Sequence, residues 1–190
     1  MHKLTRMSTI FISFLALTAL SAQEVTVIKA DRMLDVVTGK MVRNAVVVIE
    51  GNRIKSVGGK VPAGATVIGL GDVTLLPGFM DMHTHLVMTL TGDFFLSRVR
   101  ETESDAAIRG VGFARATLMA GFTTVRDVGG GQPSVALARA VENGTIPGPQ
   151  IFSARSSITI TGGHCEATGW RPGLIELDYR EGWSPMVLMR

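Results

Sequence analysis

The chain has 190 residues, of which 46% are hydrophobic, so it can bury the core of one large domain or two small ones. Its formal charge is +3 at pH 7. Two of the basic residues, Lys3 and Arg6, lie in a predicted leader, and the remaining basic and acidic side chains nearly balance. Because no basic cluster remains, we expect no nucleic-acid binding. Cys165 is the single cysteine, which excludes an internal disulfide.

Residues 1–22 have the pattern of a secretory signal peptide. A basic start without acidic residues precedes an apolar run over Ile10–Leu20, and the small residues Ser21 and Ala22 follow. The run is short for a membrane span. An N-terminal membrane anchor or a buried helix is the alternative. We expect export to the periplasm or the exterior, cleavage after Ser21 or Ala22, and no transmembrane span in the mature chain.

Residues 23–76 are predicted to form a small β module, part of a β-sandwich. The β-branched runs that predict strands cover Val25–Ile28, Ala45–Ile49, Ile54–Val57, Thr66–Ile68 and Val73–Leu76. Gly51 and Asn52 stand between two of these runs and favour a hairpin, because both tolerate the positive φ of a tight turn. The module contains no obvious catalytic residue, and we interpret it as a support for the α/β segment that begins at residue 77.

Residues 77–182 alternate between strand and helix patterns, which is typical of a parallel α/β architecture. The predicted order is a strand over 79–85, a helix from Ser104 to Gly121, a strand over 122–128, a helix from Pro133 to Gly144 and a strand over 150–154. Ser104 is the expected N-cap of the first helix. Pro133 suits the first position of the second helix.

Polar side chains follow each of the three predicted strands. His83 and His85 end the first strand, Arg126 and Asp127 end the second, and His164 follows the third. In a (β/α)8 barrel the functional groups lie at the carboxyl ends of the strands. We therefore expect these residues at the functional end of such a fold.

His83 and His85 are predicted metal ligands. Side chains alternate along a strand, so Asp81, His83 and His85 should share one side, and two imidazoles two residues apart can converge on one metal ion. Asp81 is expected to accept a hydrogen bond near the site rather than to be a ligand. We interpret Cys165 as a passive loop residue, because no neighbour clearly activates its thiol.

Three motifs resemble a known family. The stretch Leu76–His85 resembles the opening signature of the metal-dependent amidohydrolase superfamily. The stretches Ala120–Asp127 and Thr161–His164 are similar to a narrower branch, the Xaa-Pro dipeptidases and the arginine/lysine carboxypeptidases. The resemblance covers about residues 24–182. It implies a (β/α)8 barrel on a β-sandwich, here as the N-terminal part of each.

The resemblance also implies a site and an activity. One or two zinc ions would bind His83 and His85, together with a carbamylated lysine, two histidines and an aspartate from later strands. His164 would contact the substrate, and Arg126 and Asp127 would brace or line the pocket. A buried structural ion pair is the alternative for the last two. The implied substrate is a small peptide whose amide bond is hydrolysed, since a metal polarises the carbonyl and a carboxylate moves the proton.

Two other functions stay open. Imidazolonepropionase resembles this branch, but the predicted export signal argues against an intracellular relative. The other alternative is a non-catalytic chain, because residues 77–190 suffice for roughly three of the eight βα units of a barrel. We expect an N-terminal part that is inactive alone, with residues 183–190 encoded out of frame. The oligomeric state is open, with a homo-oligomer as the candidate for the complete enzyme.

Overall fold

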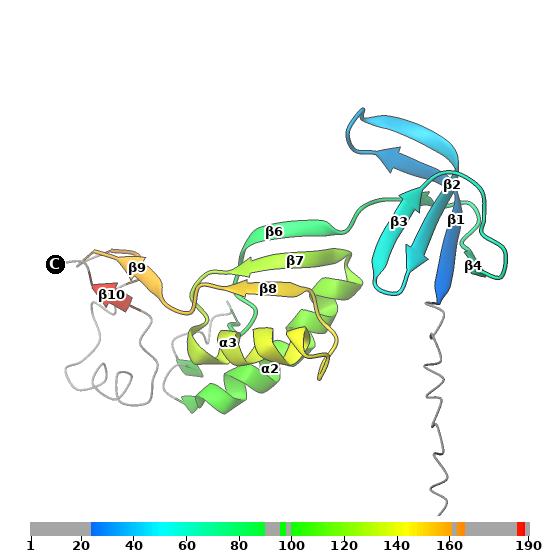
Figure 1. Ribbon diagram of the computed structural model, residues 1–190. Helices are drawn as coiled ribbons and strands as arrows, with labels where there is room; N and C mark the ends of the chain where they lie inside the picture. Colours follow the sequence, from blue (N-terminus) through cyan, green and yellow to red (C-terminus); the bar gives the residue numbers. More distant parts are fainter. Residues whose placement is uncertain (1–23, 90–95, 98–99, 161–162, 166–185, 189–190) are drawn as a thin grey trace, which may run out of the picture. The chain divides into compact units, whose positions relative to one another are not determined.

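The computed structural model describes residues 24–89, 96–97, 100–160, 163–165 and 186–188 (Figure 1). The chain divides into two compact units, residues 1–76 and 77–190. The predicted leader and most of the predicted out-of-frame tail lie outside the described residues. In the part of the chain that the structure describes, no helix is long and apolar enough to cross a membrane.

The first unit is a five-stranded sheet with its longest strands at the centre. β1 (Val25–Asp35) pairs antiparallel with β2 (Lys40–Glu50) and parallel with β4 (Thr66–Gly69) and β5 (Thr74–Leu75), and β2 pairs antiparallel with β3 (Arg53–Val57). β1 and β2 are longer than predicted, because pairing continues past their β-branched runs into mixed sequence.

Two buried apolar pairs lie at the centre of this sheet. Val27 stands opposite Val48, and Ala30 stands opposite Ala45, and all four side chains are buried. The predicted hairpin is confirmed: β2 and β3 join through a turn in which Gly51 has a φ of 60°. The second layer of a sandwich is not among the described residues, so the sandwich stays a prediction.

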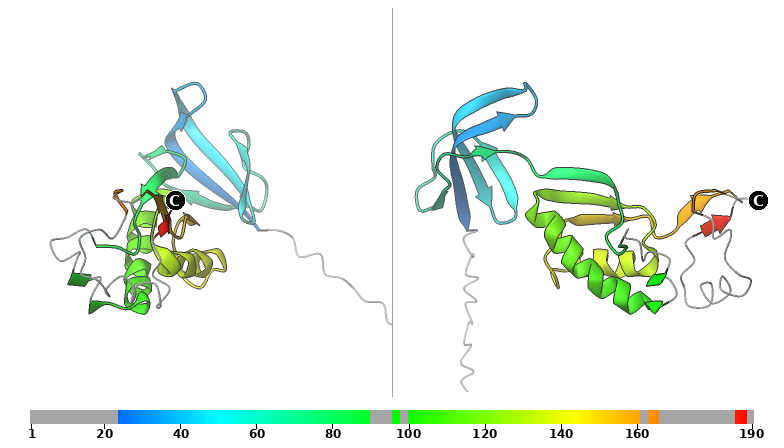
Figure 2. Two further views of the ribbon diagram at one scale, coloured as in Figure 1. Left: turned by 90° about the vertical axis from the view of Figure 1, so that its left-hand side faces the viewer. Right: turned by 180° about the vertical axis from the view of Figure 1, so that it is seen from behind.

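The second unit contains a three-stranded parallel sheet with helices on one face. Its order along the chain is β6 (Phe79–Thr84), α2 (Glu103–Met119), β7 (Phe122–Asp127), α3 (Gly131–Glu142) and β8 (Gln150–Ser153). In space the strands follow the same order, with β7 in the middle. Both helices lie on the same side of the sheet in each view (Figures 1 and 2).

The core of this unit lies between the sheet and the helices. Val125 at the centre of β7 is fully buried, and Leu137 of α3 is nearly so. The buried apolar cluster consists of Leu86, Val87, Ala106, Ala114, Val125 and Leu137. Leu86 and Val87 come directly after the predicted metal ligands, so core packing fixes the chain immediately beyond them.

The predicted helix starts are displaced by a few residues. α2 is capped by Thr102 rather than Ser104: the Thr102 hydroxyl accepts from the backbone N–H of Asp105, and the Asp105 carboxylate accepts from the Thr102 N–H. This reciprocal capping box satisfies two donors at once, which a single Ser104 cap cannot do. α3 begins at Gly131, so Pro133 lies in its first turn, where no N–H is required.

The described residues after β8 form a short parallel pair, β9 (Ser157–Thr159) with β10 (Met186–Leu188). The architecture is therefore mixed α/β, as predicted, with a strand–helix–strand–helix–strand order. A closed barrel requires eight such strands. The described residues contain three in the parallel sheet, so barrel closure stays a prediction.

Candidate metal centre

The carboxyl ends of β6 and β7 meet beside the two histidines. Thr84, the last residue of β6, is paired with Asp127, the last residue of β7. The Val128 N–H donates to the Thr84 carbonyl at 3.0 Å. His83 therefore lies within the strand, whereas His85 is the first residue beyond it, although the sequence predicted a strand that extends through His85.

The rings of His83 and His85 lie close together, with centroids 5.4 Å apart and an angle of 74° between their planes. Two imidazoles that bind one tetrahedral metal through nitrogens at about 2.0–2.1 Å have ring centres roughly 5 Å apart. The observed separation therefore fits a shared ion. The His83 side chain is exposed, and the His85 side chain is half-buried.

Asp81 shapes the strand just before His83. Its carboxylate accepts the backbone N–H of His83 at 3.0 Å. The pairing of β6 with β7 is irregular between Asp81 and Thr84. A carboxylate that accepts a nearby backbone N–H replaces a missing ladder bond. Asp81 thus holds the irregular end of β6.

Arg126 and Asp127 fasten β7 to β6 from opposite faces of the sheet. Arg126 is exposed, and its Nε donates to the Met82 carbonyl at 2.7 Å. Asp127 is fully buried, and its Oδ2 accepts the Leu86 backbone N–H at 3.2 Å and the Ser134 hydroxyl at 2.9 Å. Neighbouring residues of a strand point to opposite faces. The two side chains therefore have separate partners rather than forming the alternative ion pair.

Burial of Asp127 disfavours the ionised form of its carboxyl, and three neighbouring groups partly offset this effect. Burial raises the pKa of the Asp127 carboxyl above its ordinary value, while hydrogen bonds from Ser134 and Leu86 and the nearby His85 imidazole act in the opposite direction. A buried carboxyl with three such neighbours is typical of a functional site as well as of a structural network.

Ser134 and the Leu86 N–H are participants that the sequence analysis missed. Ser134 is fully buried in the first turn of α3. A serine in a helix's first turn after a glycine run is the available signal, because such a hydroxyl can reach the end of the preceding strand. The backbone N–H of Leu86 has no signal in the sequence.

None of the described contacts connects His164 to the residues at the carboxyl ends of β6 and β7. It is exposed in a turn after β9, and the neighbouring Gly163 N–H donates to the Ile160 carbonyl at 2.9 Å. Cys165, beside it, is a free, half-buried cysteine. No described interaction joins His164 to His83 or His85, so its substrate role stays a prediction.

The described residues supply two metal ligands. Within them, no group of three His, Cys, Asp or Glu side chains gathers closely enough to hold a metal ion. Catalytic zinc sites use three protein ligands and keep one position for water or substrate. His83 and His85 thus fit part of such a site in donor chemistry and spacing, and further ligands are required to complete it.

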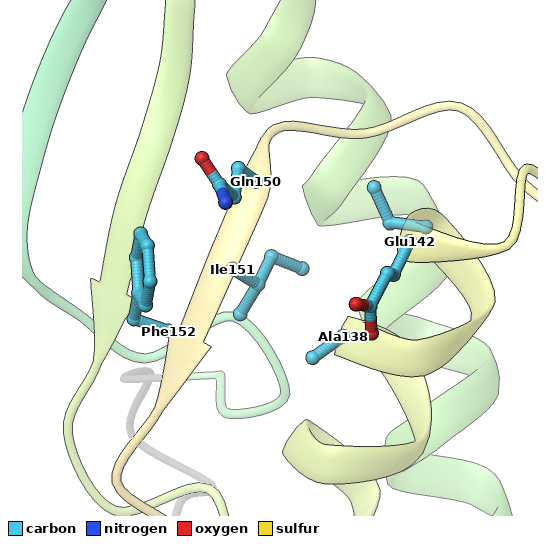
Figure 3. Close-up of a pocket in the computed structure, with 6 residues that line it drawn as sticks. Ala138, Glu142, Gln150, Ile151 and Phe152 are labelled. Carbon is cyan, nitrogen blue, oxygen red and sulfur yellow. The ribbon is translucent and has the colours of Figure 1, made fainter.

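A hollow of about 510 Å³ lies elsewhere, between the second half of α3 and the edge strand β8 (Figure 3). It is lined by Ala138, Val141, Glu142, Gln150, Ile151 and Phe152. Gln150 begins β8, whereas the histidines stand at the carboxyl end of β6. The hollow therefore lies toward the amino-terminal end of the parallel strands, whereas the histidines lie at the carboxyl end. It is not the candidate metal centre.

Comparison with protein families matches residues 74–181 to the amidohydrolase family. The matched segment contains both histidines, all three strands of the parallel sheet and the buried Asp127. The chain belongs to the amidohydrolase family.

The chain is similar to an ochratoxinase, a prolidase and an Xaa-Pro dipeptidase. It is 29% identical over 134 residues to ochratoxinase from Aspergillus niger, covering 66% of this chain and 27% of that one. A prolidase solved with N-methylphosphonate-L-proline is 29% identical with a TM-score of 0.70, over 87% of this chain and 40% of that one. An Xaa-Pro dipeptidase with bound methionine is 30% identical with a TM-score of 0.69, over 79% and 38%. The chain thus spans about a quarter of the curated relative's length.

Proposed function

We propose that this chain carries the first pair of metal ligands of a zinc-dependent amidohydrolase that cleaves amide bonds of small peptides. The observation that supports this most directly is the pair of rings, His83 and His85, 5.4 Å apart at the carboxyl end of β6. That position within a family-matched segment is where parallel α/β folds place their chemistry.

His83 and His85 would hold the metal, since imidazole nitrogen is a preferred ligand of zinc. When bound, zinc supplies Lewis acidity toward a carbonyl and lowers the pKa of water to near neutrality. The chain's own contribution is positional. Asp81 fixes the His83 backbone, and Arg126 fixes the Met82 carbonyl beside it. Both contacts limit where the His83 ring can lie.

The substrate class is inferred from what the similar proteins share. One similar structure is a prolidase with a bound proline phosphonate, and another is an Xaa-Pro dipeptidase with bound methionine. We propose that the substrate here is a dipeptide of the Xaa-Pro type or one with a C-terminal arginine or lysine. The predicted leader supports an exported enzyme rather than an imidazolonepropionase.

The 190-residue chain alone is proposed to lack turnover. Two ligands hold a metal weakly, and the aspartate and lysine that the family resemblance implies come from later strands. Self-association is one route by which such a site could be completed, which keeps a homo-oligomer as the candidate assembly.

A hydrolysis assay tests this function. The full chain, made without a polyhistidine tag, is incubated with zinc and a panel of Xaa-Pro, Xaa-Arg and Xaa-Lys dipeptides, beside the His83→Ala, His85→Ala and His164→Ala variants. We expect no turnover above the zinc blank. Hydrolysis that His83→Ala abolishes would mean that self-association completes the site. Hydrolysis that survives both His83→Ala and His85→Ala would exclude the proposed role of the pair.

A further inference from the structure

One oxygen of the buried Asp127 carboxyl accepts hydrogen bonds, and the other accepts none from the described residues. Oδ2 accepts from the Leu86 N–H and the Ser134 hydroxyl. Oδ1 is buried and, among the described residues, accepts no hydrogen bond. Burying a hydrogen-bond acceptor without a donor is unfavourable, so an unused carboxylate oxygen in a core calls for a partner.

A complementary unsatisfied atom belongs to His85. Its Nδ1 is buried without a partner in the described part of the chain. Leu86, whose N–H bonds to Asp127, follows His85 directly, and Thr84, which precedes it, is paired with Asp127 across the two strands. Asp127 is therefore joined to both neighbours of His85, to Thr84 by backbone pairing and to Leu86 through its carboxylate. The His85 imidazole also interacts electrostatically with this carboxylate.

We propose that Asp127 is a positioning residue: its Oδ1 accepts the Nδ1–H of His85 and thereby directs the Nε2 lone pair toward the metal. This rests on the proposed function, because it takes His85 to be a metal ligand. The hydrogen bond satisfies both buried atoms at once. It also selects the tautomer in which Nε2 carries no proton, since a neutral imidazole has one N–H and one acceptor nitrogen.

The rest of the Asp127 network serves this task. Leu86 and Ser134 hold Oδ2 from the end of β6 and from α3, so the carboxyl cannot rotate freely. Carboxylates that accept the free N–H of a ligating histidine fix its ring, and losing one typically costs 10–100-fold in metal affinity. A purely structural Asp127 would hold the two elements together without affecting the imidazole tautomer.

The substitution Asp127→Asn separates these roles. The Leu86 N–H requires an acceptor, so the amide oxygen should occupy the Oδ2 position and the NH₂ group should face His85. A donor at that position forces Nδ1 to accept and moves the proton to Nε2. The variant keeps the shape and the contacts to Leu86 and Ser134 while reversing the tautomer.

The experiment records ¹⁵N ring shifts of labelled histidines in the metal-free full chain at about pH 8, with His85 identified by loss of its signals in His85→Asn. We expect the Nδ1–H tautomer in the wild type and in the control Arg115→Met, at an exposed position of α2, and the Nε2–H tautomer in Asp127→Asn. Zinc affinity should fall about 10–100-fold in Asp127→Asn.

An Nε2–H tautomer in the wild type, or an unchanged Nδ1–H tautomer in a folded Asp127→Asn, would overturn the proposal. If Asp127→Asn does not fold, the wild type decides: a protected, downfield Nδ1 proton supports the bond, and its absence excludes it. The tautomer that His85 adopts without metal does not depend on whether the chain is part of an enzyme. Failure of zinc binding with the Nδ1–H tautomer intact would remove the metal role while leaving the Asp127–His85 bond in place.

Discussion

The guanidinium Nε of Arg126 donates to the main-chain carbonyl of Met82 at 2.7 Å. The contact joins the end of β7 to the residue just before His83. Asp127, the next residue of β7, reaches the chain just after His85 from the opposite face of the sheet. The two adjacent residues thus brace the histidine segment at both of its ends.

Replacing Arg126 should weaken the first of these braces. Arg126→Met keeps an apolar stem and removes the donor, and we expect the free energy of unfolding of the second unit to fall by about 1 kcal/mol. Zinc affinity should also fall, because the backbone before His83 gains freedom. Urea denaturation and zinc titration measure the two effects. Arg115→Met, an exposed position on α2, is the control and should change neither.

Gly130 leaves no room for a side chain beside Ser134, the hydrogen-bond partner of Asp127. A Cβ at Gly130 would lie 2.5 Å from Ser134 Cβ and 2.8 Å from Val87 Cγ2. We expect Gly130→Ala to destabilise the unit by about 1–3 kcal/mol, since a packed core resists added volume. Gly112→Ala on α2, where a Cβ meets nothing within 4 Å, should instead stabilise by about 0.5–1 kcal/mol. Equal effects of the two substitutions on thermal unfolding would contradict this packing.

The capping box of α2 should give the chain an acid-sensitive contribution to stability. Hydrogen bonds from the Thr102 backbone N–H and hydroxyl hold the pKa of Asp105 below its ordinary value of 3.8. A folded pKa below the unfolded one means that ionised Asp105 stabilises the chain fully above 3.8. That contribution disappears as the pH falls through the folded pKa.

Unfolding experiments on the wild type and Asp105→Ala across this pH range measure the effect. The difference between their free energies of unfolding should be constant near neutrality and shrink below pH 3.8. A difference that grows on acidification would show that the shift has the opposite sign. Thr102→Ala should separately cost about 1 kcal/mol through loss of the N-cap.

The predicted leader can be tested by finding the mature N-terminus. In a bacterial host, we expect the exported chain to begin at Ala22 or Gln23, as read by mass spectrometry. Leu15→Arg places a charge in the apolar run and should block both export and cleavage. A wild-type chain that keeps Met1 would favour the anchor or buried-helix alternative.

The sequence predicted the order of the parallel unit because each strand and helix carries its own local signal. In the first unit, β-branched runs indicated the strands, and the Gly51 hairpin followed from turn chemistry. Thr102 was missed as the cap because two candidate hydroxyls stood two residues apart, and only the reciprocal contact with Asp105 distinguishes them.

The site was predicted less completely, for a different reason. His83 and His85 are close in the sequence, so their spacing shows that they can converge. The partners of Asp127 come from separate elements, and its approach to Leu86 and Ser134 depends on the register of β6 against β7 and on the placement of α3. No local pattern encodes such a register.

A calorimetric zinc titration of the full, untagged chain tests most directly the central claim that His83 and His85 are metal ligands. We expect weak binding of about one equivalent, because the described residues supply two of the ligands that a closed zinc site uses. His83→Ala and His85→Ala should each abolish it, and His164→Ala, an exposed histidine outside the cluster, should leave it unchanged. Binding that persists unchanged in both of the first two variants would contradict the assignment of this pair as the metal ligands.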